Sequence, residues 1–282
     1  MPRSMIAVAA AFALAALPPA AGADDTKPPA PAAAPAAAAP AAPAAPAAAA
    51  PAAPAAPAPA VDWKARYEVL YGTRDQPASL KEMFALTEAQ LAKDPGDYEA
   101  QWRLAQLYCW QANGMTDGTD LKANIGKRCW DAGEKAVALN QADVKGQYWA
   151  AVGMGLYSEG LGILSALSQG IEGKIKNRVE LAIAADKDYL DGGPTMLFGR
   201  ILWKLPWPKR DLDESIKLLR ATLEAHPKNL RAKIYLADAL HTDDKEADAK
   251  ALAQSALDAP LGWDQPDDKR NHEQAKKWLA NH

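Results

Sequence analysis

Apolar residues recur at helical spacing along most of the chain beyond residue 60. The pattern is clearest between Pro227 and Pro260, in two groups of three: Leu236, Ala237 and Leu240, and then Ala249, Ala253 and Ala256. Each group lies on one face of a helix, so the segment is expected to form two amphipathic helices joined by a polar turn. The prolines stand outside the helices, where a missing N–H costs little. Small side chains on both faces favour close packing of the two helices as a hairpin.

Similar pairs of helices are expected upstream. Their first helices carry the patterns Leu104-Ala105-x2-Tyr108, Ala150-Ala151-x2-Met154 and Phe198-Gly199-x2-Leu202. The partner helices are expected at 127–140, around 179–183 and at 216–223, with a divergent opening pair at 63–71 and 80–91. A polar helix at 267–280 would cover the end of the stack. The sequence therefore predicts an all-α fold for residues 61–282, a right-handed α-solenoid of about four to five helix pairs with long central hairpins and a C-terminal capping helix.

Two of these hairpins contain long connecting segments. Residues 111–126 include Asn113-Gly114 and Asp117-Gly118, which are loop signals, and glycines crowd the segment from Gly153 to Gly173. Gly173-Lys174 is followed by Ile175 and not by Ser or Thr, which excludes a phosphate-binding P-loop. We expect the second segment to be a long hairpin that packs closely through its small residues. The pattern leaves open whether this hairpin borders an open groove or folds inward to close a pocket.

The segment 227–260 resembles one tetratricopeptide (TPR) repeat, a helix–turn–helix unit of about 34 residues with the pattern L-G-x2-Y, then A-x3-F, then P. Leu236-Ala237-x2-Leu240 corresponds to the first part and Ala249-x3-Ala253 to the second. The resemblance implies a stack of hairpins in which the first helices line a concave face and their partners form the outer wall.

Two narrower resemblances cover roughly residues 95–260. Tyr148-Trp149-Ala150-Ala151, the segment 179–183 and Leu197-Phe198-Gly199-Arg200 look like the repeat core of eukaryotic regulators of microtubule dynamics. Asp191-Gly192-Gly193-Pro194, followed by Phe198-Gly199 and Leu205-Pro206, is similar to TPR proteins associated with bacterial TRAP transporters. The second resemblance implies a role in delivering a small ligand across the periplasm.

The first residues of the chain are typical of a secretory signal peptide. Arg3 precedes an apolar run from Met5 to Leu17, and Ala21-Gly22-Ala23 supplies small residues for cleavage. A transmembrane helix needs about 20 apolar residues, so the run is too short for an uncleaved anchor. We therefore expect residues 1–23 to be removed, and the protein to be periplasmic or secreted with no transmembrane segment in the mature chain.

The segment that follows has a different composition. Every residue from Pro28 to Ala60 is Ala or Pro, which cannot form a specific core. Residues 24–60 are therefore expected to be a disordered linker that acts as a spacer. The alternatives are that the linker is a tether that spans the cell wall, or that it is itself the ligand of a proline-binding partner. The folded domain is expected to span residues 61–282.

Composition excludes several classes of function. The net charge of −3 argues against a nucleic-acid-binding surface, which needs concentrated basic residues. The four histidines, His226, His241, His272 and His282, show no metal-ligand spacing, and no nucleophile motif such as G-x-S-x-G occurs. We therefore expect no enzyme activity, no metal and no cofactor.

The chain has two cysteines, Cys109 and Cys129. They are expected at the end of one helix and the start of its partner, where antiparallel packing could bring them together. Export favours a disulfide between them, and two buried thiols that act as small apolar residues are the alternative.

Binding is the remaining class of function. With the apolar positions buried, the concave face of the predicted solenoid carries aromatic residues among polar ones: Trp102, Arg103, Gln106, Tyr148, Trp149, Arg200, Trp203, Arg231, Tyr235, Asp238 and His241. Such a mixture suits an extended peptide or a small polar ligand, although each aromatic could instead pack between repeats. We expect an exported, non-catalytic scaffold that engages a protein or peptide partner through this face. A transporter-associated binder of a small ligand is the alternative, and the partner's identity and the oligomeric state remain open.

Overall fold

The computed structural model describes residues 62–282. The predicted signal peptide and linker lie outside these residues. Within them, twelve α-helices account for the fold: α1 Trp63–Tyr71, α2 Pro77–Lys93, α3 Tyr98–Asn113, α4 Asp120–Leu139, α5 Val144–Leu161, α6 Ile163–Ser168, α7 Ile171–Asp186, α8 Tyr189–Lys204, α9 Leu212–Ala225, α10 Leu230–Thr242, α11 Glu246–Leu257 and α12 Gln265–Asn281. The same residues contain no strand and no helix both long and apolar enough to cross a membrane.

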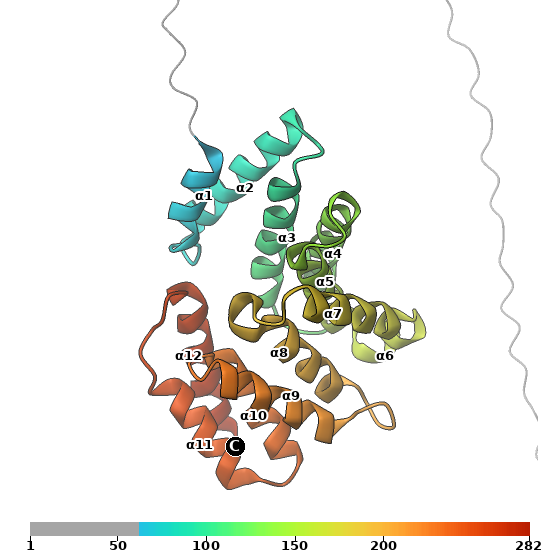
Figure 1. Ribbon diagram of the computed structural model, residues 1–282. Helices are drawn as coiled ribbons and strands as arrows, with labels where there is room; N and C mark the ends of the chain where they lie inside the picture. Colours follow the sequence, from blue (N-terminus) through green and yellow to red (C-terminus); the bar gives the residue numbers. More distant parts are fainter. Residues whose placement is uncertain (1–61) are drawn as a thin grey trace, which may run out of the picture. The chain divides into compact units, whose positions relative to one another are not determined.

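The helices pack mainly against their neighbours in the chain (Figure 1). Five pairs form successive layers: α1 with α2, α3 with α4, α5 with α7, α8 with α9, and α10 with α11. The short α6 connects the two helices of the third pair, and α12 covers the last pair. The predicted all-α solenoid of about four to five helix pairs is confirmed, and the described residues form five pairs with one long central hairpin and a capping helix.

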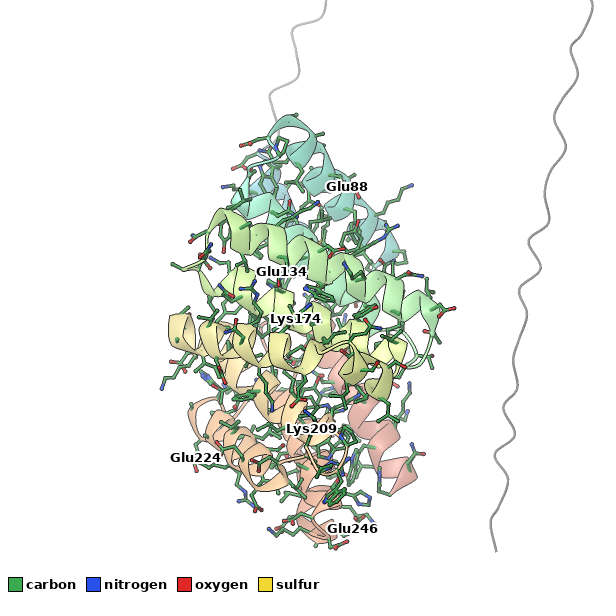
Figure 2. All side chains as sticks on the ribbon, turned by 90° about the vertical axis from the view of Figure 1, so that its right-hand side faces the viewer. Glu88, Glu134, Lys174, Lys209, Glu224 and Glu246 are labelled. Carbon is green, nitrogen blue, oxygen red and sulfur yellow. A yellow bond between two sulfur atoms is a disulfide. The ribbon has the colours of Figure 1, made fainter. Side chains whose placement is uncertain are left out.

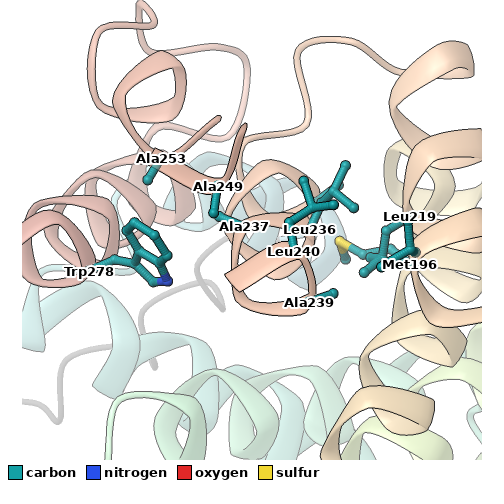
Figure 3. Close-up of a cluster of buried hydrophobic side chains, with 11 residues drawn as sticks. Met196, Leu219, Leu236, Ala237, Ala239, Leu240, Ala249, Ala253 and Trp278 are labelled. Carbon is teal, nitrogen blue, oxygen red and sulfur yellow. The ribbon is translucent and has the colours of Figure 1, made fainter. Parts of the chain in front are cut away.

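The buried apolar residues of the described chain form six clusters, which are distributed over the successive layers. The largest cluster joins α8 to α12 and includes Leu219, Leu240 and Trp278, all less than a tenth exposed (Figure 3). Ala237, Ala249 and Ala253 are fully buried in this cluster, so the small residues of the sequence pattern do let α10 and α11 pack closely. Charged residues such as Lys174, Lys209 and Glu224 lie on the outside (Figure 2).

Helices α4 and α5 approach each other unusually closely, at positions that only glycine can occupy. A Cβ atom on Gly133 would lie 2.5 Å from the backbone of Ala150, and one on Gly153 would lie 2.3 Å from the backbone of Trp130. Gly126 and Gly160 meet the opposite backbone in the same way. Of the glycine-rich segment 153–173, Gly153 and Gly160 therefore pack closely, against α4, whereas the other glycines of the segment have no neighbour within 4 Å of a Cβ position.

The predicted loops are shorter than the glycine content suggested. Helix α3 continues to Asn113 and α4 begins at Asp120, so the loop expected over 111–126 covers only 114–119. Thr119 starts α4 early because its hydroxyl accepts a hydrogen bond from the backbone N–H of Lys122 at 3.3 Å. Similarly, Gly153, Gly155 and Gly160 lie inside α5, where two of them, Gly153 and Gly160, make backbone contacts that leave no room for a side chain.

Cys109 of α3 and Cys129 of α4 are joined as a disulfide, with their Cα atoms 5.3 Å apart. Both cysteines are buried, and the backbone carbonyl of Trp149 lies next to both sulfur atoms. The bond links the two helices of the second layer at the level where α5 packs against them.

Candidate functional site

The two ends of the helical array meet through side chains. Arg74, in the turn between α1 and α2, donates two hydrogen bonds of 2.6 and 2.7 Å to the carboxylate of Asp264, which precedes α12. The guanidinium of Arg74 also stacks on Tyr71 and on Trp110 of α3, and Arg270 of α12 stacks on Trp110 at 3.5 Å. We call these five residues the closing cluster.

The closing cluster is made almost entirely of polar and aromatic contacts. Helix α12 does not pack along α1, α2 or α3, so the closure depends on side chains rather than on an apolar helix interface. Arg74 is nevertheless only 4% exposed, because the two aromatic rings cover it. Burial and the nearby charges of Arg231 and Arg74 lower the pKa of Arg270 to about 10. An exposed pair, Lys269 with Asp75, adds a second link at 3.0 Å.

Behind the closing cluster lies a cavity of about 700 Å³ on the inner side of the array. Every layer contributes to its wall, from Tyr71 in the first to Asn271 in α12. Its apolar part comes from the middle layers and contains Trp149, Val152, Leu156, Ile163, Met196 and Leu197. The cavity falls within the range of about 300–1,000 Å³ that is common for ligand pockets.

Four cations in the cavity wall, three arginines and one lysine, are matched by carboxylates. Arg74 faces Asp264, Arg231 faces Asp267 and Arg200 faces Asp238. Lys204 lies 2.7 Å from Glu159, which also pairs with the buried Lys122. Burial would raise the pKa of Glu159, but the positive charges of Lys204 and Lys122 outweigh it and lower that pKa below its usual value. These four positive charges are therefore compensated by neighbouring carboxylates.

One part of the cavity wall contains polar side-chain atoms that have no hydrogen-bond partner among the described residues. Asp267 accepts one bond from Arg231 and another, of 3.0 Å, from the side-chain amide of Asn271. Asn271 is 1% exposed, and its Oδ1 atom has no partner among the described residues. The nearby hydroxyl of Tyr148 makes no hydrogen bond with residues 62–282, and burial raises its pKa. We call Tyr148, Arg231, Asp267 and Asn271 the polar wall.

A strained turn borders the cavity at the start of α8. Leu190 and Asp191 have left-handed backbone angles, with φ of 51° and 56°. The turn is held by Asn229, which donates to the Asp191 carbonyl at 2.8 Å, and by Trp263, whose indole N–H donates to the Asp191 carboxylate at 2.8 Å. Non-glycine residues in this conformation cost free energy and concentrate at ligand clamps and other functional sites.

Comparison with solved structures identifies the architecture. The crystal structure of TTC0263, a thermophilic TPR protein from Thermus thermophilus, matches with a TM-score of 0.56 and 15% identity, over 76% of this chain and 99% of that one. The chain has the TPR fold. The crystal structure of PilW, a widely conserved type IV pilus biogenesis factor, matches with a TM-score of 0.49 and 16% identity, over 78% of this chain and 91% of that one.

Comparisons at the level of sequence add one finding. The family model for regulator of microtubule dynamics protein 1-3 matches residues 68–192, which span the first three layers of the TPR array. No curated protein sequence matches the chain. The likeness to TRAP-associated TPR proteins, noted on residues 191–206, stays a prediction.

The residues predicted for the concave face fall into two groups. Six of them line the cavity of the TPR array: Gln106, Tyr148, Trp149, Arg200, Arg231 and Tyr235. Trp149 is partly buried in two apolar clusters, and its indole N–H donates to the hydroxyl of Tyr189 at 3.2 Å. Arg200 stacks on the ring of Tyr235 at 4.3 Å. Their role in binding stays a prediction.

The other five predicted residues lie outside the cavity wall, where they support the helices. Arg103 is 7% exposed, pairs with Glu68 of the first layer and stacks on Trp102 at 4.4 Å, while Lys145 of α5 also lies over the Trp102 ring. Trp203 donates to Thr242 at 2.9 Å, and Asp238 accepts from Trp278 at 2.9 Å. His241 is exposed and pairs with Glu246 beyond the end of the cavity.

Sequence reasoning missed the part of the site that the closure creates. Tyr71, Arg74 and Trp110 come from the first two layers, whereas Asp264, Asp267 and Asn271 come from α12 and the loop before it. Helical periodicity assigns positions within one hairpin and its neighbours, and it carries no information on contacts between opposite ends of an array. One signal was available for the close packing of α4 with α5, because their glycines recur every seven residues.

Proposed function

We propose that this protein is an exported, non-catalytic binding protein that holds a short segment of a protein partner in its cavity. The observation that carries the proposal is the cavity of about 700 Å³ that is lined by every layer of the TPR array and by its closing helix. Aromatic and aliphatic side chains on one side and paired charges on the other can accommodate both the side chains and the backbone of a peptide.

A small amphipathic ligand is the second candidate. The size of the cavity supports it, and so does the central hairpin, because Ile163, Ala166 and Leu167 of α6 contribute to the wall. Helix α6 borders the cavity on one side, and Arg74 and Asp264 border it on another. A cavity bordered in this way suits a compact ligand better than a long groove would.

A glycine in the cavity wall offers a direct test. Gly155 lines the cavity, and a Cβ atom there would meet nothing within 4 Å, so the Gly155→Phe side chain would extend into open space. Gly173→Phe is the matched control, since Gly173 is also helical and uncrowded but lies outside the cavity wall. Proteins that co-purify with the wild type from the periplasm should be lost with Gly155→Phe and kept with Gly173→Phe.

The outcomes separate the candidates. Partners that bind Gly155→Phe as well as they bind the wild type would show that the cavity is not the binding site. A small bound molecule in native mass spectrometry of the wild type, displaced in Gly155→Phe without loss of any protein partner, would favour the second candidate.

Export is a separate part of the proposal. It is supported by the signal-like residues 1–23 and by the pairing of both cysteines, which is usual in oxidising compartments. Mass spectrometry of the protein from cells should show a mature chain that begins at Asp24. A chain that keeps residues 1–23 and remains in the cytoplasm would contradict export.

A further inference from the structure

We propose that Trp263 is an aromatic lid on the cavity, which a hydrogen bond to Asp191 holds open and which closes over a bound ligand when this bond breaks. Trp263 belongs to the loop between α11 and α12, residues 258–264, and its side chain lines the cavity. The inference rests on the proposed function and adds to it a moving part and the residue that controls the movement.

Trp263 is far more exposed than the other tryptophans and tyrosines of the cavity wall. It is 64% exposed, whereas Tyr148 is buried and Trp149 is packed in two apolar clusters. Trp263 belongs to none of the six apolar clusters of the described residues, so its ring can move without breaking apolar packing. Contact between this ring and an apolar part of a ligand would remove the exposed surface from water, which is favourable.

A single hydrogen bond holds the indole in its observed position. The indole N–H of Trp263 donates to Asp191 Oδ2 at 2.8 Å, and this bond joins the loop before α12 to the first turn of α8. Helices α8 and α12 do not pack along each other, so no helix interface supports the contact. The side chain of Asp191 is 51% exposed, and water can therefore replace the indole as its donor when the bond breaks.

The backbone on both sides of this bond is held by other contacts. The backbone N–H of Gly262 donates to a carboxylate in the first turn of α12 at 2.6 Å, and Asp264 belongs to the closing cluster. On the other side, the side-chain amide of Asn229 donates to the carbonyl of Asp191 at 2.8 Å. Closure therefore requires only rotation of the Trp263 side chain, and exposed side chains change rotamer within picoseconds to nanoseconds.

The bond to Asp191 competes with closure, because the indole cannot bind Asp191 and cover a ligand at the same time. Removing the carboxylate should therefore favour the closed lid and raise the affinity for a ligand that contacts the ring. Removing the ring should lower this affinity. The opposite signs distinguish a lid from residues that only support the wall, for which both substitutions would weaken binding.

The uncharged dye N-phenyl-1-naphthylamine is a suitable probe. Its aromatic groups offer apolar surface that a lid can cover, and its fluorescence increases in apolar surroundings. Because the dye has no charge, loss of the Asp191 carboxylate does not change its affinity by simple electrostatics. Titration of the mature protein gives the Kd, and stopped-flow fluorescence gives the dissociation rate constant. Gly155→Phe, which fills part of the cavity, shows whether the dye binds there.

Three variants test the lid. Trp263→Ala should raise the Kd about tenfold, mainly through faster dissociation, because an aromatic contact with the ligand is lost. Asp191→Gly should lower the Kd by about threefold, as expected for one competing hydrogen bond, and glycine adopts the φ of 56° at this position without strain. The double variant should bind like Trp263→Ala, since the Asp191 carboxylate has no effect once the indole is absent.

Trp207→Ala is the matched control. Trp207 is 88% exposed and lies outside the cavity wall, so its replacement should leave the Kd unchanged. Both tryptophans are largely exposed, and the helical circular dichroism spectrum and the urea midpoint should therefore be the same for both alanine variants as for the wild type.

Several results would overturn the lid. They are a Kd that rises with Asp191→Gly, an effect of Asp191→Gly that is the same with and without the indole, and an effect of Trp263→Ala no larger than that of Trp207→Ala. If Gly155→Phe still weakens dye binding in these cases, the cavity remains the binding site and only the lid is wrong. No dye binding, or binding that Gly155→Phe leaves unchanged, would contradict the proposed function together with the lid.

Discussion

Replacing Arg74 with methionine tests whether the closing cluster stabilises the domain. Methionine keeps an unbranched side chain of similar reach but removes the guanidinium and all of its hydrogen bonds. Arg74 is 4% exposed and donates two hydrogen bonds to Asp264, whose side chain is 17% exposed. The substitution therefore leaves a carboxylate that is largely buried and has lost its counterion.

The expected loss follows from these contacts. Removing one partner of a buried ion pair costs about 3–5 kcal/mol, mostly because the remaining charge is uncompensated. Asp264 keeps some solvent and still accepts from the backbone N–H of Asp267 at 3.2 Å, which places the pair at the lower end of this range. Stacking of Arg74 on Tyr71 at 3.9 Å and on Trp110 at 4.3 Å adds about 0.5–1 kcal/mol each. Arg74→Met should therefore reduce the free energy of unfolding by about 4–5 kcal/mol.

Arg66→Met is the matched control. Arg66 of α1 also makes two hydrogen bonds to one carboxylate, that of Glu82, but both side chains are about 40% exposed. Exposed pairs contribute less than about 1 kcal/mol, so this substitution should have a small effect.

Urea unfolding followed by circular dichroism measures both variants, provided that the slope of free energy against urea stays constant. A loss for Arg74→Met no greater than that for Arg66→Met would show that the ends of the array are not held by the cluster. A reduced slope for Arg74→Met alone would indicate that the first layer separates before the rest unfolds, since repeat arrays lose cooperativity when an interface weakens.

Three further predictions concern other parts of the domain. Gly153→Ala should cost several kcal/mol in urea unfolding, because its Cβ would lie 2.3 Å from the backbone of Trp130, whereas Gly155→Ala should stabilise by about 0.5–1 kcal/mol; equal effects would contradict the close packing of α4 and α5. Replacing Cys109 and Cys129 with alanine should lower stability by about 3 kcal/mol, as the chain-entropy model gives for a separation of 20 residues, and an unchanged urea midpoint would refute this. Glu159→Gln should destabilise by about 3 kcal/mol near neutral pH, the lower end of the range for a buried pair, because Glu159 keeps some contact with solvent. Because the folded pKa of Glu159 lies below 4.5, its contribution is present above that pH and is lost as the pH falls further, so the difference from the wild type should shrink in acid; a constant difference would contradict the pairing with Lys204 and Lys122.

Local patterns were sufficient to predict the layers of the fold. Apolar positions at helical spacing, such as Leu236, Ala237 and Leu240, are buried in the core as expected. The reason is that each helix of a TPR array packs mainly on its neighbours in the chain, so the sequence of one hairpin contains most of the information on its own burial. Helix boundaries were less certain, because glycines usually mark loops, and here Gly126, Gly153 and Gly160 lie within helices at close backbone contacts.

The candidate site was only partly predictable for a related reason. Arg231 and Tyr235 were placed on the inner face by rotating one helix, and both line the cavity. Trp102 and Arg103 occupy matching positions in an earlier repeat, but neither lines the cavity. Glu68 of α1 pairs with Arg103, and Lys145 of α5 lies over the ring of Trp102. The same reasoning could not find the contact between Arg74 and Asp264, which are 190 residues apart in the chain.

The C-terminal helix connects the closure of the array with the binding site. The segment before and within the first turns of α12 supplies Asp264 to the closing cluster and Asp267 and Asn271 to the polar wall. A ligand held by the polar wall therefore binds to the same rigid helix that Arg74 holds in place, and it must bind more weakly to any state in which the ends have separated. By linkage, such a ligand stabilises the closed array, and substitutions that weaken the closing cluster reduce its affinity even though they do not touch it. Under the proposed function, the helix that ends the stack is therefore part of the site as well as of the closure.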